Sequence, residues 1–76
     1  MNADEVQRCL EVGREALVLL AELIVSGERN RGEMYVRARV EADALVSLLD
    51  ESAEAEHPAI HALLERYDTL MAALVN

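Results

Sequence analysis

The stretch at residues 16–25 constrains the fold of this chain more than any other, because nine of its ten residues are apolar. A helix on the surface of a small domain needs one apolar stripe, whereas this stretch is apolar nearly all round. A helix of that kind is normally buried on most of its sides. Seventy-six residues offer little to bury it with. The excess apolar surface therefore predicts contact with a second copy or another protein.

The length predicts a single helical domain over residues 1–76, at the size where one core is only marginally stable. A domain this small buries only roughly 60% of the surface that its unfolded chain exposes. Cys9 is the single cysteine, so a disulfide within the chain is excluded. Oligomerisation is another common way of stabilising a small domain, and an apolar content of 53% favours it.

Apolar residues recur at helical spacings, and no segment alternates with the period of two that is typical of a strand. We therefore expect an all-α fold, a three-helix up-down-up arrangement completed as a helical bundle by homodimerisation. The expected helices lie at about 3–26, 31–52 and 58–75.

Residues with strong end-of-helix preferences mark the boundaries. Gly27 is placed to end the first helix in a left-handed turn. Asn30 followed by Glu33 predicts a capping box at the start of the second helix. Pro58 suits the first turn of the third helix, where its missing N–H costs nothing.

The first helix is expected to bury one side in its own domain and to leave the other side free. We expect the other two helices to pack on Leu20. The residues expected to be covered with it are Val12, Leu19 and Leu23. The opposite flank is then free to pack against a symmetry mate. Its residues are Leu10, Leu17, Val18, Ala21, Ile24 and Val25.

The net charge is −8, with seven arginines and no lysine, and this charge argues against direct nucleic-acid binding. The charges are also separated along the chain, because residues 28–39 are net basic and residues 41–56 contain no base. The acids are either a solubilising face or a surface that engages a basic partner. The arginines serve either salt bridges within an oligomer or recognition of a partner. The charged candidates are Arg29, Arg31, Arg37, Arg39, Glu51, Glu54 and Glu56.

Few residues in the sequence suggest a catalytic or metal-binding site. Glu54 and His57 form a Glu-x-x-His string of the kind that holds metals in helical bundles, and His61 follows four residues later. The string lies at a helix start on a solvated face, so we expect a capping His57, a solvated His61 and no metal. Cys9 falls in the apolar arc and is expected to be a small buried hydrophobe. The chain has no phosphate-binding loop, so we expect no enzyme and no cofactor.

These expectations predict a non-catalytic protein–protein interaction module, a small dimeric helical adaptor, chaperone or inhibitor of another protein. The alternative is an acidic, antitoxin-like or decoy inhibitor of a basic protein that handles nucleic acid, and a further alternative is a metal-binding helical bundle. The longest apolar run is too short to cross a membrane. Asp4 and Glu5 have the wrong charge for the start of a signal peptide. We therefore expect a soluble, cytoplasmic protein.

Overall fold

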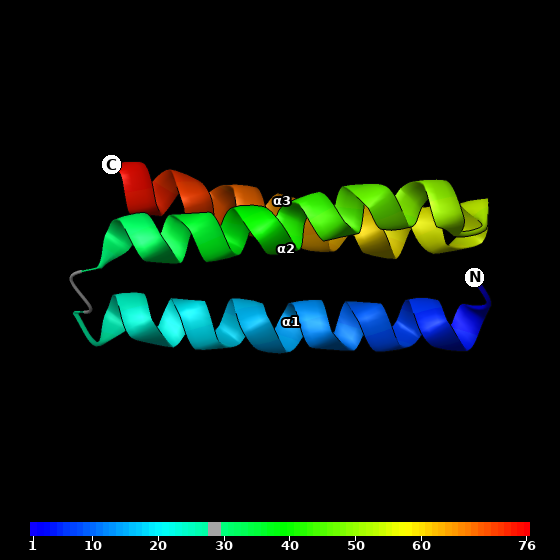
Figure 1. Cartoon of the computed structure of the whole chain (residues 1–76), viewed down its shortest axis with the longest axis horizontal. Helices are drawn as coiled ribbons and strands as arrows, with labels where there is room; N and C mark the ends of the chain where they lie inside the picture. Colours follow the sequence, from blue (N-terminus) through cyan, green and yellow to red (C-terminus); the bar gives the residue numbers. More distant parts are fainter. Residues whose placement is uncertain (28–29) are drawn as a thin grey trace.

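The computed structural model describes residues 1–27 and 30–76. Within these ranges the chain forms three α-helices, a short 3₁₀ segment and no strand. The elements are α1 (Ala3–Val25), α2 (Arg31–Glu51), η1 (Glu54–Glu56) and α3 (His57–Val75). The helices run up, down and up along a molecule measuring 38 × 17 × 16 Å (Figure 1). The predicted all-α class and helix order are confirmed, while η1 was not expected.

The helix ends follow the local signals in the sequence. The Asn2 side chain accepts a hydrogen bond from the Glu5 N–H at 2.9 Å and caps α1. Gly27 has a φ of 82°, so the predicted left-handed turn is confirmed. The Asn30 side chain accepts from the Glu33 N–H at 3.2 Å and caps α2. The Glu33 carboxylate in turn accepts from the Asn30 side-chain amide, which completes the predicted reciprocal pair.

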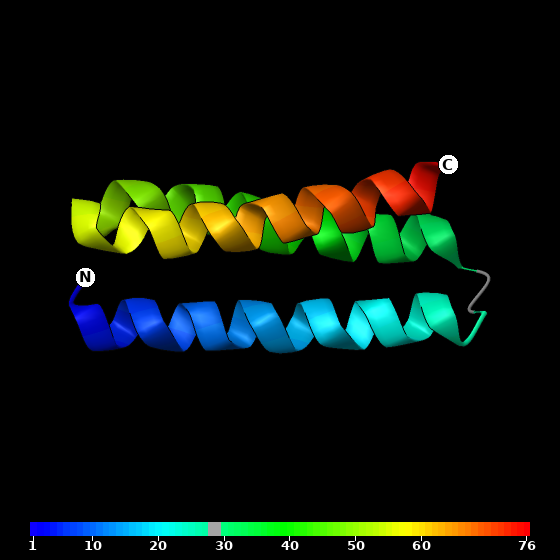
Figure 2. The same cartoon turned by 180° about the vertical axis from the view of Figure 1, so that it is seen from behind.

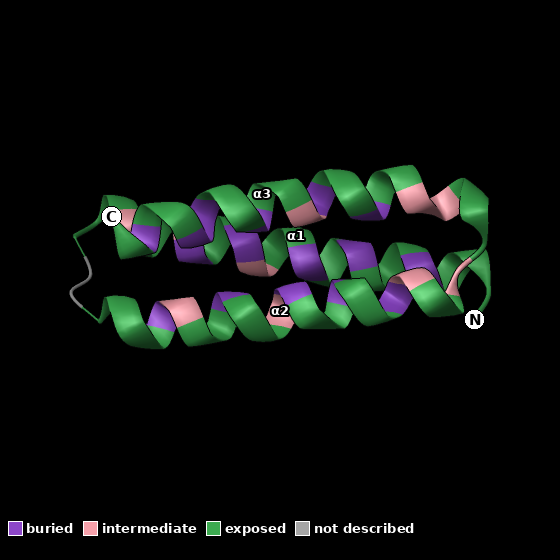
Figure 3. Ribbon diagram, turned by 90° about the horizontal axis from the view of Figure 1, so that it is seen from above, coloured by how far each residue is buried: buried purple, intermediate pink, exposed green. Residues whose placement is uncertain are grey.

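Each helix contributes one buried stripe at spacings of three and four residues (Figure 3). α2 and α3 lie against each other, and α1 packs on both of them along their length (Figures 1 and 2). On α2, the small residues Ala38 and Ala42 are buried, which suits a close approach of the neighbouring helices. The stripe of α1 consists of Val6, Leu10, Gly13, Leu17 and Leu20. The stripe of α3 is centred on Tyr67.

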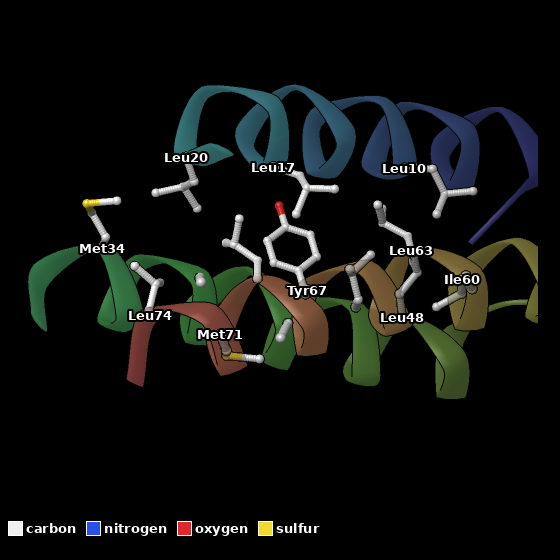
Figure 4. Close-up of a cluster of buried hydrophobic side chains, with 14 of the residues drawn as sticks. Leu10, Leu17, Leu20, Met34, Leu48, Ile60, Leu63, Tyr67, Met71 and Leu74 are labelled. Atoms are coloured by element: carbon white, nitrogen blue, oxygen red, sulfur yellow. The ribbon is translucent and has the colours of Figure 1, made fainter. Parts of the chain in front are cut away.

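Tyr67 and Gly13 make the closest polar contact between α1 and α3. The Tyr67 ring is fully buried, and its hydroxyl points toward α1 (Figure 4). The hydroxyl donates a hydrogen bond to the Gly13 carbonyl at 2.5 Å. A Cβ added at Gly13 would lie 3.0 Å from Leu63 Cδ2. Gly13 therefore allows α1 to approach α3 closely, although glycine lowers the intrinsic stability of a helix.

The expected covering of α1 is confirmed for Leu20, which is buried, and is wrong for the residues expected around it. Val12 is 59% exposed, Leu19 62% and Leu23 37%, although these residues were expected to be covered. Leu10 and Leu17, expected on the free flank, are only 0% and 4% exposed. The reason is Gly13, whose carbonyl and bare Cα face α3 and fix the rotation of α1 about its axis. With that rotation, the side of α1 that carries Leu19 turns away from the core.

The first prediction concerns the close approach at Gly13. An alanine at Gly32 would meet nothing within 4 Å, so Gly32→Ala should stabilise the fold through helix propensity by up to about 1 kcal/mol. Gly13→Ala has at least the same propensity advantage, because Gly13 lies in the interior of α1 and Gly32 in the first turn of α2, but Leu63 must shift to admit the new methyl group. Urea unfolding should therefore show a smaller gain for Gly13→Ala than for Gly32→Ala, or a loss. An equal gain in both variants would contradict the close approach.

The second prediction concerns alkaline pH. Burial, and secondarily the negative charge of Glu41, raises the pKa of Tyr67 from 10.0 to about 12. The fold thus favours the neutral phenol, so this stabilisation is complete below pH 10 and is lost as the pH rises toward 12. Because each pKa unit is worth about 1.4 kcal/mol, the loss should reach about 3 kcal/mol. The chain has no lysine, so tyrosines dominate titration in this window.

The measurement is a pH titration of the Tyr35→Phe variant, followed by tyrosinate absorbance and circular dichroism. We expect Tyr67 to ionise only near pH 12, together with loss of helicity. Tyr67→Phe is the matched control, and its stability should change little between pH 10 and 12. Half-ionisation of Tyr67 at pH 10 with full helicity would contradict the buried, hydrogen-bonded phenol.

Candidate functional site

An apolar stripe on α1 faces solvent beside α2. Val12, Ala16, Leu19 and Leu23 follow one another at spacings of four, three and four residues, so they share one side of the helix. Ala16 is half-buried, whereas the three larger side chains are exposed. We call this stripe, together with Arg37 and Glu41 of α2, the α1–α2 face.

A groove of about 510 Å³ runs along this face between the two helices. Leu20, which is buried, contributes to its lining, together with Leu19 and Leu23 of α1. Arg37 and Glu41 line the groove from α2. Glu41 is half-buried, so part of its carboxylate side chain is shielded from water. Glu41 was not among the candidates predicted from the sequence, although its spacing from Arg37 places the two on one side of α2.

The charged residues on two sides of α2 differ in whether they form an ion pair with each other. In the described part of the chain, the one ion pair joins Arg39 to Asp43 at 3.4 Å, with both side chains largely exposed. Arg37 and Glu41 have the same spacing of four residues, but they form no such pair in residues 1–27 and 30–76. The groove therefore holds one base, Arg37, and two acids, Glu22 and Glu41, and none of the three forms an ion pair within the described residues.

A second groove, of about 580 Å³, lies between α1 and α3. Leu17, Val18, Ala21 and Val25 of the expected dimer flank line it, opposite Arg66 and Leu70. Val18 is 48% exposed and Val25 is 87% exposed, whereas Leu17 belongs to the core. The two remaining flank residues do not line this groove. Leu10 is buried in the core, and Ile24 packs against the core. The expected flank is therefore divided between the core and this groove.

The three described members of the predicted arginine cluster do not share one surface. Arg29 lies outside the described residues. The Arg31 guanidinium donates to the Ala73 carbonyl at 3.5 Å, near the end of α3. Arg37 lines the α1–α2 groove, whereas Arg39 lines a depression between α2 and α3.

The predicted acidic candidates lie around the turn between α2 and α3. Glu51 and Glu54 are exposed. Glu56 is half-buried and accepts a hydrogen bond from Gln7 Nε2 of α1 at 3.4 Å. Both interpretations of these acids, solubilising face and recognition surface, stay predictions.

The candidate metal ligands play structural parts. His57 Nε2 donates to the Leu49 carbonyl at 3.0 Å. The predicted capping at the start of α3 is wrong, because α3 has no side-chain cap and the His57 ring instead bonds to the last turn of α2. His61 is exposed, as expected. Among the described residues, no group of three His, Cys, Asp or Glu side chains is arranged to hold a metal ion.

Cys9 corrects a further expectation, because the thiol is exposed rather than buried. It lies at the edge of the apolar arc that α2 and α3 leave uncovered. The same rotation of α1 that exposes Leu19 therefore exposes Cys9.

Comparisons with protein-family models, curated proteins and solved structures find no match to this chain. No helix in the described ranges is long and apolar enough to span a membrane. The features of the described chain that bear on function are the two grooves and the charges beside them.

Proposed function

We propose that this chain is a non-catalytic protein–protein interaction module, a small helical adaptor, chaperone or inhibitor that acts as a homodimer. The observation that carries the proposal is the apolar side of α1 that its own fold leaves open. Three large side chains there, Val12, Leu19 and Leu23, face solvent beside a groove. Contiguous apolar surface of this kind marks protein–protein contact more often than isolated exposed residues do.

The placement of the titratable groups also supports a binding role. Tyr67 is the residue with a strongly raised pKa, and such residues often mark active sites. Here the phenol is buried in the core and donates to the Gly13 carbonyl, so its raised pKa reflects packing first and the charge of Glu41 second. The exposed thiol of Cys9 suits a reducing compartment, and we propose that the protein acts in the cytoplasm.

The third prediction tests this proposal by light scattering on a size-exclusion column. The wild-type chain should show a mass near twice 8.4 kDa. Leu19→Glu combined with Leu23→Glu places two charges on the exposed stripe, where they cost little in the monomer but are incompatible with a buried interface. This double variant should be a monomer whose helicity matches the wild type.

The matched control is Val46→Glu combined with Val75→Glu, because these valines are also exposed but lie outside the α1–α2 face. The control should remain a dimer. Leu17→Glu, which charges a core position, should instead unfold the chain. A wild-type protein that is monomeric at high micromolar concentration would contradict the homodimer.

A further inference from the structure

We propose that the second copy packs antiparallel across the α1–α2 face, so that Arg37 of each copy pairs with Glu41 of the other. This inference rests on the homodimeric function proposed above and specifies how the two copies meet. It predicts a core formed by two α1 helices and two α2 helices, with α3 of each copy on the outside.

The apolar stripe of α1 is complementary to itself in an antiparallel arrangement. Consider a two-fold axis that is perpendicular to α1 and passes midway between Ala16 and Leu19. This axis places Ala16 opposite Leu19 of the second copy. Val12 lies four residues before Ala16, and Leu23 lies four residues after Leu19. The same axis therefore also places Val12 opposite Leu23 of the second copy. Each large exposed side chain of the stripe then gains an apolar neighbour.

The charges of α2 fit the same axis. Arg37 and Glu41 line the same groove as Ala16 and Leu19, and α2 runs antiparallel to α1 (Figure 1). The axis that passes between Ala16 and Leu19 therefore crosses α2 between Arg37 and Glu41. Because the second copy runs in the opposite direction, each arginine faces the glutamate of the other copy.

Arg37 and Glu41 form no ion pair with each other in the described residues, although Arg39 and Asp43 at the same spacing do, so both groups are available for this pairing. An interface between identical copies must be complementary to itself, and here both the apolar pattern and the charge pattern meet that condition. The two ion pairs also bring no like charges together, which matters for a chain of net charge −8.

The size of the face is sufficient for a specific dimer. A face 38 Å long and 17 Å wide, covered on both copies, buries on the order of 1,200 Å², which lies at the lower end of specific interfaces. Two exposed large apolar side chains line each groove, Val18 and Val25 between α1 and α3 and Leu19 and Leu23 between α1 and α2. Val12 adds a third on the α1–α2 face, and that face also carries the self-complementary charges. The α1–α2 face is therefore the surface that we assign to the second copy.

The fourth prediction uses charge reversal, read out as the dimer dissociation constant from sedimentation equilibrium. Arg37→Glu makes both intermolecular pairs acidic, and Glu41→Arg makes both pairs basic. Each variant alone should dimerise more weakly, on the order of tenfold or more. An equimolar mixture of the two variants should recover a heterodimer, because every cross-pair then joins an arginine to a glutamate.

Recovery in the mixture distinguishes pairing between copies from pairing within α2. Inside each variant, positions 37 and 41 still carry like charges, so a purely intrahelical effect would persist after mixing. The matched control is Arg39→Glu mixed with Asp43→Arg, which reverses the pair that the structure shows within α2. The control variants should dimerise as the wild type does, alone and mixed.

The outcomes separate the two proposals. A wild-type dimer that the Arg37 and Glu41 variants leave unchanged, or that the mixture fails to recover, would overturn this inference but preserve the homodimer. A wild-type monomer would overturn the proposed function as well.

Discussion

The contact between Tyr67 and Gly13 determines how the rest of the molecule is arranged. The phenol is buried and donates to the Gly13 carbonyl, while Leu63 occupies the space that a side chain at Gly13 would need. These contacts fix α1 both along its axis and in rotation about it. The rotation decides which part of the broad apolar surface of α1 enters the core and which part remains outside.

The leftover surface follows from geometry and chain length together. Two helices can cover one side of α1, and they cover the line from Val6 to Leu20. The stripe that includes Leu19 and Leu23 then faces solvent beside Arg37 and Glu41. A single core in a chain of this size gains little stability. In the proposed homodimer, burial of this stripe against a second copy would add to that stability.

The helices and their ends could be predicted from the sequence because their causes are local. A glycine at position 27 and an asparagine at position 30 act on the residues beside them, whatever the tertiary structure.

The faces of α1 could not be predicted in the same way. An apolar arc of about 200° contains several possible buried stripes, and periodicity alone does not choose among them. The deciding residue was Gly13, which carries no hydrophobic signal but marks the line of closest approach to α3. The errors at Leu10, Leu17, Leu19 and Cys9 share this cause, since all of them follow from one wrong rotation of the helix.

The central claim is that α1 is shared between its own core and that of a second copy. An isotope-filtered NOE measurement on a mixture of labelled and unlabelled chains tests it most directly, because it detects only contacts between copies. We predict intermolecular NOEs between the methyl groups of Val12 and those of Leu23. Intermolecular NOEs confined to Val18 and Val25 would place the dimer on the α1–α3 groove and contradict the account.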